Sequence, residues 1–251
     1  MLKNIVIIGY GNIARKHIEV LKALGCNIAA TSNRSVEKRD MAMQEGISMV
    51  YSDYHQMIQK EKPDGIIVCV SFWNMFTVLS DIIPYGIPIL AEKPTGTSLA
   101  EHKSLQVLAS KYKTPIMVAL NRRHYSVLNK AIELAGGKQN ITNVLIEWSE
   151  DPFHLANKKK LNNELIHKTI FENTIHGLDL LTYLAGEISD INISAVNLGD
   201  PFRWIMNISG KSDTNTIYNF NSSMDNFVPW RVVFYAQNKS CLLYTSPSPR
   251  D

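Results

Sequence analysis

Three polar residues with helical spacing form the group in this sequence best suited to proton transfer. Glu172 and His176 are four residues apart, and Asp179 follows three residues later, so a helix would place all three on one face. The opposite stripe is apolar and should pack in the core; it consists of Ile175, Leu178, Leu181 and Leu184. Histidine side chains titrate near neutral pH, so an imidazole beside an orienting acid is suited to moving a proton. The alternative is a surface histidine between two solvated acids.

A second group, near the N-terminus, is suited to binding phosphate. Residues 5–8 form a continuous β-branched run, which is typical of a buried parallel strand. They lead into residues 9–14, Gly-Tyr-Gly-Asn-Ile-Ala. Gly9 allows a tight turn, Gly11 lets the backbone approach a pyrophosphate, and Ala14 lets the next helix pack closely. The stretch therefore predicts a bound dinucleotide, with a plain glycine turn as the alternative.

The residues expected to contact this dinucleotide extend to the end of the second strand. Asn12 and Ile13 begin the first helix, whose N–H groups and positive dipole end should face the phosphates. Ser32, Asn33 and Arg34 occupy the position that carries a ribose-binding acid in NAD-specific folds. A carboxylate would repel a 2′-phosphate, whereas arginine and hydroxyl groups would bind it. We therefore predict NADP(H) in preference to NAD(H); the alternative is an arginine exposed at a helix start.

Composition narrows the class of protein. A chain of 251 residues that is 45% hydrophobic and 20% charged suits one large or two medium globular domains. The net charge of +3 is too small and too scattered to indicate binding to nucleic acid. The three cysteines lack metal-ligand spacing, so we expect neither a metal site nor a disulfide framework. The chain starts with a strand pattern and has no membrane-length apolar run, so we expect a cytoplasmic protein.

The order of the elements indicates an α/β fold in two domains. Over residues 1–120, six apolar strands alternate with helices, which predicts a Rossmann, doubly wound parallel sheet with its ligand at the carboxyl ends of the strands. Over residues 121–240 the pattern predicts an incomplete α+β domain with a mainly antiparallel sheet. Its expected elements are helices at 127–134 and 173–184 and strands near 144–148, 191–196, 204–208, 216–220 and 230–235.

The end of the chain needs a separate interpretation. Residues 241–251 follow an interrupted strand pattern, begin no new element in the sequence, and resemble the frame translation of a sequencing adapter. We therefore expect a non-native tail and a second domain cut off near residue 240. The alternative is a genuine flexible tail, because Ser-Pro-Ser-Pro composition is typical of one.

Four motifs in this order resemble the Gfo/Idh/MocA family of glucose–fructose oxidoreductases and inositol dehydrogenases. They are residues 9–14 with His17 a turn later, residues 91–94 (Ala-Glu-Lys-Pro), residues 121–123 (Asn-Arg-Arg) and residues 176–181. Each motif alone is common, but the combination over nearly all of the first 240 residues is specific. The resemblance implies a substrate domain after the Rossmann domain and a homodimer or tetramer paired through the second-domain sheet.

The resemblance also implies roles for individual residues. Lys93 would contact both the nicotinamide side of the cofactor and the substrate, where its ammonium would stabilise developing alkoxide charge. His176 would be the catalytic histidine and contact the substrate, and Glu172 stands where relatives commonly have Asp. Apart from the resemblance, the charge of Arg122 and Arg123 is suited to binding an acidic or phosphorylated group of the substrate. The alternatives are an exposed cation for Lys93 and a local ion pair for Arg123.

Three further cofactor contacts are expected after the fourth and fifth strands. After the fourth strand, relatives commonly have Thr-Pro-Asn, whereas this chain has Ser71-Phe72-Trp73-Asn74. We expect Ser71 to lie beside the cofactor, and Trp73 either to form a wall of the crevice or to fill it. Glu92, which precedes Lys93 at the ligand edge of the sheet, is also expected to contact the cofactor.

These observations predict an NADP(H)-preferring oxidoreductase. It would transfer a hydride between nicotinamide and a hydroxyl or keto group of a sugar, polyol or related small molecule. A non-catalytic NADP(H)-binding sensor or scaffold is the alternative from another class. A third interpretation is an inactive fragment that lacks its last strands and exposes an open sheet edge.

Overall fold

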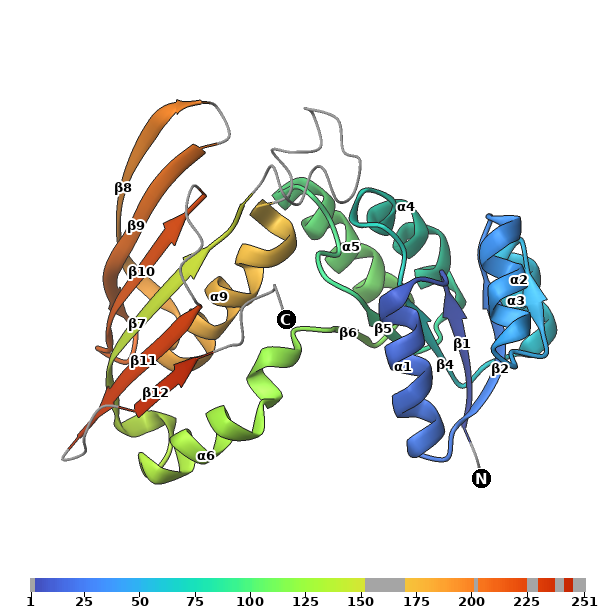
Figure 1. The fold of residues 1–251 in the computed structure, drawn as a ribbon, viewed down its shortest axis with the longest axis horizontal. Helices are drawn as coiled ribbons and strands as arrows, with labels where there is room; N and C mark the ends of the chain where they lie inside the picture. Colours follow the sequence, from blue (N-terminus) through green and yellow to red (C-terminus); the bar gives the residue numbers. More distant parts are fainter. Residues whose placement is uncertain (1–2, 152–169, 201–202, 225–229, 238–241, 246–251) are drawn as a thin grey trace. The chain divides into compact units, whose positions relative to one another are not determined.

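The computed structural model describes residues 3–151, 170–200, 203–224, 230–237 and 242–245. It consists of two compact units, Met1–Ala119 and Leu120–Asp251, each described here by itself (Figure 1). The division predicted from the sequence falls between residues 120 and 121. In the described parts of the chain, no helix combines the length and apolar character needed to cross a membrane.

The first unit is built on a parallel sheet of six strands in the order β3-β2-β1-β4-β5-β6, which confirms the predicted doubly wound Rossmann fold. Its strands are β1 (Asn4–Ile8), β2 (Asn27–Ser32), β3 (Val50–Tyr51), β4 (Gly65–Val68), β5 (Ile89–Ala91) and β6 (Ile116–Val118). Its helices are α1 (Asn12–Ala23), α2 (Val36–Gln44), α3 (Tyr54–Glu61), α4 (Phe72–Ile82), η1 (Ile83–Tyr85) and α5 (Leu99–Tyr112).

The first strand is buried on both faces, as its β-branched sequence predicts. Val6 joins the apolar cluster on one face of the sheet, which also contains Val68. Ile7 joins the cluster on the other face, with Ala14 and Ile18 of α1. Ala14 is fully buried, so its small side chain lets α1 pack against the strands. The packing fixes the start of α1 at the carboxyl end of β1.

The second unit contains a sheet of six strands in the order β12-β11-β7-β10-β9-β8. Its strands are β7 (Ile141–Ser149), β8 (Ile188–Asp200), β9 (Arg203–Ser212), β10 (Ile217–Ser223), β11 (Arg231–Ala236) and β12 (Leu242–Thr245). Its helices are η2 (Asn121–His124), α6 (Ser126–Leu134), η3 (Lys138–Asn140) and α9 (Ile170–Ala185). The sheet is mainly antiparallel, as predicted, but β7 and β10 pair in parallel because α9, β8 and β9 intervene between them in the chain.

Helix α9 covers one face of this sheet (Figure 1). Leu180, Leu181 and Leu184 are buried in a cluster with the aromatic side chains of Trp148 and Phe220. Of the other two residues of the predicted apolar stripe, Leu178 is partly buried and packs against this cluster, whereas Ile175 is partly buried and is not part of it. The polar side chains of His176 and Asp179 are buried as well, so the buried surface of α9 extends beyond the predicted apolar stripe.

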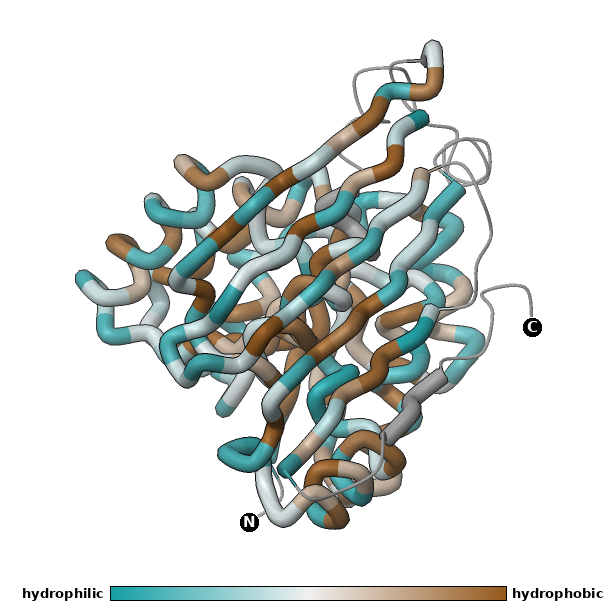
Figure 2. Tube along the Cα trace, turned by 90° about the vertical axis from the view of Figure 1, so that its left-hand side faces the viewer, coloured by the Kyte–Doolittle hydropathy of each residue, from teal (hydrophilic) through white to brown (hydrophobic). Residues whose placement is uncertain are grey.

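The other face of the sheet carries exposed apolar side chains. Figure 2 looks onto the second sheet and shows hydrophobic and hydrophilic residues alternating along its strands. Exposed apolar side chains on this other face include Val196, Ile205 and Ile217. The exposed Ile191 and Ile193 lie instead on the α9 face, because Ile193 is opposite Ile208, which is opposite the buried Phe220. This alternation is typical of an antiparallel sheet with only one covered face.

Residues of the expected tail form a strand, contrary to the expectation that they begin no new element. Strand β12 pairs antiparallel with β11, with Val232 opposite Tyr244. The physical reason is that β11 would otherwise have an open edge, and Leu-Leu-Tyr-Thr has the composition to pair with it whatever its origin. The remaining residues of the expected tail, 241 and 246–251, lie outside the described residues.

Candidate functional site

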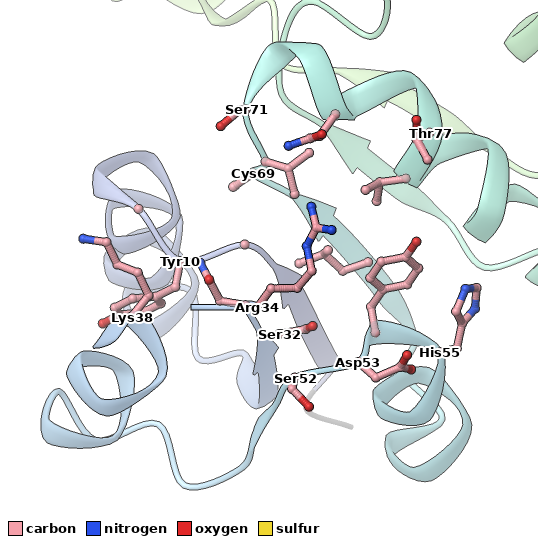
Figure 3. A pocket seen from close by; sticks show the side chains of 18 residues that line it. Tyr10, Ser32, Arg34, Lys38, Ser52, Asp53, His55, Cys69, Ser71 and Thr77 are labelled. Atoms are coloured by element: carbon pink, nitrogen blue, oxygen red, sulfur yellow. The ribbon is translucent and has the colours of Figure 1, made fainter. Parts of the chain in front are cut away.

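A cavity of about 630 Å³ opens in the first unit where β1, β2, β3 and β4 end (Figure 3). Ligands of doubly wound folds bind at this edge of the sheet. The predicted residues in its lining are Gly9, Gly11, Ser32, Asn33, Arg34 and Ser71. Residues that the sequence reasoning missed are Tyr10, Lys38, Ser52, Asp53, Tyr54, His55, Cys69, Val70, Asn74, Thr77 and Val78, with Ile8 at the strand end.

The glycine loop has the geometry that phosphate binding requires. Gly9 has a φ of +97°, and a Cβ there would lie 2.6 Å from the carbonyl oxygen of Cys69. At Gly11, by contrast, a Cβ would meet nothing within 4 Å among the described atoms. Gly11 is also the N-cap of α1, and the described residues supply neither a capping side chain nor an acid in the first turn. The free N–H groups of α1 therefore fit a dinucleotide phosphate.

The Tyr10 side chain anchors the glycine loop. Its side chain is almost completely buried, and its hydroxyl donates to Glu45, just beyond the end of α2. Arg15 of α1 holds the same carboxylate, with Nη2 2.7 Å from Oε1. Burial and this carboxylate raise the pKa of Tyr10 to about 12, so the hydroxyl keeps its proton and its hydrogen bond. The contact joins the glycine loop, α1 and α2.

The turn after β2 is held by its own hydrogen bonds. The side-chain Oδ1 of Asn33 accepts from the N–H of Ser35 at 2.8 Å. Arg39 donates from Nη1 to the carbonyl oxygens of Asn33 at 2.8 Å and Arg34 at 2.9 Å. Asn33 is thus a turn-former, while the Arg34 side chain extends into the cavity (Figure 3). The hydrogen-bonded turn thus fixes the backbone from which Arg34 enters the cavity.

The one acid in this cavity lining has a structural partner. Asp53 is the N-cap of α3 and accepts from the N–H of Gln56 at 2.7 Å. Lys38, in the first turn of α2, is a second cation among the lining residues. The end of β2 therefore presents positive charge where NAD-specific folds present a carboxylate.

Two aromatic residues extend the wall beyond the second strand. The Tyr54 hydroxyl donates to Asp81 at 2.6 Å, and burial together with this carboxylate raises the pKa of Tyr54. The neighbouring His55 ring lies 4.5 Å from that of Tyr54, and its Nδ1 is 3.0 Å from the Tyr85 hydroxyl. Their position directly after β3 is the signal that sequence reasoning could have used, because all parallel strands end at this edge.

Five predicted cofactor contacts lie outside the lining of this cavity. They are Asn12, Ile13, Trp73, Glu92 and Lys93. Trp73 is 40% exposed in the first turn of α4 and contacts the ring of Phe72 edge-on. Glu92 and Lys93 follow β5, and the Glu92 carboxylate lies 2.9 Å from Nε2 of His17. The cofactor roles of these five residues stay predictions.

In the second unit, Arg123 and Asp179 form an ion pair. Nε of Arg123 is 2.7 Å from Oδ2 of Asp179, and Nη2 bonds the other carboxylate oxygen. The hydrogen bonds to Asp179 raise the pKa of Arg123. His176, 6% exposed, lies one turn earlier on α9. Arg123 is predicted to bind substrate and Asp179 to orient His176. Both roles stay predictions, and the structure adds that the two side chains are paired with each other.

The neighbouring Arg122 anchors the same segment in an aromatic cluster. Its guanidinium carbon lies 4.4 Å from the ring of Trp230, which stacks on Trp148 at 4.1 Å. Cation–π contact and stacking fix η2 against β7. This leaves Arg123 directed at α9. Glu172 also belongs to α9, four residues before His176, and its side chain lies outside the described residues.

The fold and the glycine loop define a dinucleotide-binding protein, and comparison with known proteins specifies the family. Residues 3–120 match the family described as oxidoreductases with an NAD-binding Rossmann fold, Gfo/Idh/MocA. The chain is 27% identical over 187 residues to myo-inositol 2-dehydrogenase of Thermotoga maritima, covering 72% of this chain and 54% of that protein. These matches assign residues 3–120 to the Gfo/Idh/MocA oxidoreductase family, in agreement with the resemblance of the sequence motifs.

Solved structures share the fold of the chain. A dehydrogenase from Chromobacterium violaceum superposes with a TM-score of 0.81 at 12% identity, covering 97% of this chain and 72% of that one. Scyllo-inositol dehydrogenase from Lactobacillus casei, solved with NAD(H) and scyllo-inositol, has a TM-score of 0.77 at 15% identity, covering 97% and 76%. The chain spans about half the length of the curated relatives that it matches.

Proposed function

We propose that this chain belongs to an NADP(H)-preferring dehydrogenase or reductase that acts on a hydroxyl or keto group of a sugar, polyol or related metabolite. The observation that carries the proposal is the cavity at the end of β2, where Arg34 and Lys38 line a space beside an open glycine loop. When bound, the nicotinamide cofactor supplies the hydride chemistry. NAD(H) remains the alternative cofactor, and it is the one named in the Lactobacillus casei structure.

The described residues fit the parts of NADP(H) one by one. The N–H groups at the start of α1 would hold the pyrophosphate, because the described residues leave this helix end without a side-chain cap. The guanidinium of Arg34 would pair with the 2′-phosphate through two parallel hydrogen bonds, with Lys38 as a second charge. Ser32 would bind a ribose hydroxyl from the end of β2.

The reacting groups of the proposal come from both units. Lys93, at the end of β5, would stabilise the charge that develops on the substrate oxygen. His176 of α9 would remove or return the hydroxyl proton, with Glu172 on the same helix face to orient its ring. Asp179 would act with Arg123, whose side chain is 37% exposed and could still contact an acidic substrate group.

The substrate class and the assembly are supported by the relatives. The Thermotoga maritima relative is a myo-inositol dehydrogenase, and one structural neighbour was solved with scyllo-inositol, so a cyclic polyol is the first substrate to test. We further propose that the apolar outer face of the second sheet pairs two copies of the chain. Light scattering of the purified protein should then give the mass of a dimer or tetramer, and a monomer would contradict the pairing.

The experiment that tests the reaction uses the purified chain and the complete native gene product side by side. Each is incubated with NADP⁺ or NAD⁺ and a panel of inositols, sugars and sugar acids, and nicotinamide absorbance is followed. Turnover of one panel member with NADP⁺ supports the proposal. Tight NADPH binding by the complete protein without turnover of any panel member would instead favour the non-catalytic sensor or scaffold.

A further inference from the structure

One hydrogen-bonded pair in the first unit has no place in the proposed reaction. His17 lies in the middle of α1, and its Nε2 is 2.9 Å from Oε1 of Glu92, across 75 positions of sequence. The two side chains are 22% and 18% exposed, so the contact is largely shielded from water. A shielded contact between a carboxylate and a ring N–H is stronger and more directional than a surface ion pair.

The two partners belong to segments with defined positions. The N–H of Glu92 donates to the carbonyl oxygen of Val68 at 2.9 Å, so its backbone continues the pairing of β5 with β4. Helix α1 starts at Gly11, in the glycine loop that lines the cavity. The pair therefore joins the helix whose first turn would hold the cofactor phosphates to the segment that carries Lys93.

The charge of Glu92 also reaches the cavity wall. Burial raises the pKa of the Cys69 thiol, and the nearby Glu92 carboxylate raises it further. Cys69 lines the cavity, whereas Glu92 does not. The carboxylate thus lies behind the wall, bound to His17. This geometry gives the charge of Glu92 a structural partner in addition to the predicted contact with the cofactor.

We propose that His17 and Glu92 are positioning residues that hold Lys93 in its reactive place. The inference rests on the proposed function of Lys93. With His17 present, the carboxylate of Glu92 is directed to α1. Without His17, that partly buried carboxylate would attract the adjacent ammonium of Lys93, keep it charged and draw it away from the substrate oxygen. Misplacement of a reacting group by about 1 Å can cost on the order of a hundredfold in rate.

The test measures the reactivity of Lys93 directly and needs no substrate. The whole chain is labelled with limiting acetic anhydride, and mass spectrometry gives the labelling rate of Lys93 relative to Lys16 and Lys22, which are exposed on α1. His17→Ala should lower the Lys93 rate about threefold or more, because an unpaired carboxylate favours the charged amine. In the double variant with Glu92→Ala the rate should return to that of Glu92→Ala alone.

Two further variants separate positioning from general loss of structure. His17→Gln keeps a donor of similar reach and should keep the Lys93 rate within about twofold of wild type. Glu19→Ala, at an exposed position on the same helix, is the matched control and should change nothing. Equal Lys93 rates in wild type and His17→Ala would overturn the proposal. So would effects of His17→Ala and Glu92→Ala that simply add, because a functional pair must couple.

Turnover gives an independent readout wherever the panel provides a substrate. His17→Ala should lower kcat about tenfold while KM and the Kd for NADPH change about twofold or less, and His17→Gln should recover most of kcat. A rise in KM with unchanged kcat would overturn the positioning role. If the wild-type protein turns over no substrate, the proposed function fails, and the labelling rates still decide whether the pair positions Lys93.

Discussion

The two units carry their candidate functional residues in different ways. In the first unit these residues stand at strand ends and in the first turns of helices, as Gly9, Ser32 and Ser71 do. In the second unit, His176 and Asp179 lie inside a helix that is packed against a sheet, and Arg123 reaches Asp179 across 56 positions of sequence.

The two groups of candidate residues differ in how strongly they depend on the core. Loop residues such as Arg34 can change without disturbing the strands behind them, so the first unit can alter its ligand while keeping its fold. The second unit has no such freedom around His176. A Cβ at the adjacent Gly177 would lie 2.8 Å from ring atoms of both Trp148 and Phe220. The candidate residues of α9 therefore lie on a helix whose packing against the core leaves no room for an added methyl group at Gly177.

The largest expected effect is on the reaction itself. His176→Ala should lower turnover by about a hundredfold or more, because the reacting proton loses its acceptor. The Kd for NADPH, measured by fluorescence, should stay nearly unchanged, because the cavity lies in the first unit. Thr182→Ala, at an exposed position on the same helix, serves as the control and should retain turnover. Unchanged turnover in His176→Ala would remove this residue from the mechanism.

A smaller effect is expected from overpacking α9. Gly177→Ala places a methyl group against Trp148 and Phe220, and overpacking of this kind costs about 1–3 kcal/mol. Urea unfolding should show the loss, while NADPH affinity stays at the wild-type value. Gly11→Ala should have the opposite effects. Its Cβ meets no described atom within 4 Å, so stability should stay close to wild type, but the methyl group obstructs the approach of phosphate and should weaken NADPH binding. An equal loss of NADPH affinity in both variants would contradict the expectation that cofactor binding depends on the first unit alone.

Local patterns in the sequence were sufficient to predict most of the fold and much of the cofactor cavity. The run at residues 5–8 and the glycines after it are short-range signals, and the structure has the strand, the turn and the helix where these signals place them. Arg34 was found because the ribose position follows directly from the end of β2. Tyr54 and His55 were missed, although the same rule applied to β3 would have found them.

What could not be predicted depends on contacts between distant residues. Nothing near Arg123 indicates that it pairs with Asp179, because that pairing needs η2 to lie against α9. No local sequence pattern predicts the pairing of His17 with Glu92 either, because the two residues are 75 positions apart. The buried surface of α9 extends beyond the predicted stripe for a similar reason: His176 and Asp179 are buried by tertiary packing, which local periodicity does not report.

The smallest expected effect concerns the hydrogen bond from Tyr10 to Glu45, which anchors the glycine loop. The hydrogen bond from Tyr10 is the largest cause of the lowered pKa of Glu45. A carboxyl group whose pKa is lowered in the folded state contributes stability at pH values above its ordinary pKa of 4.5. This contribution is lost as the pH falls through the pKa of the folded state. Tyr10→Phe should therefore flatten the fall in thermal stability below about pH 5. Parallel curves for both proteins would show that Tyr10 has no such role.

The central claim is that the end of β2 selects NADP(H), and one ratio tests it most directly. The Kd values for NADPH and NADH are measured by fluorescence titration for wild type and for Arg34→Ala. We predict that wild type binds NADPH at least about tenfold more tightly than NADH. In Arg34→Ala the two Kd values should become nearly equal, mainly through weaker NADPH binding. Equal affinity in wild type, or tighter binding of NADH, would contradict the account.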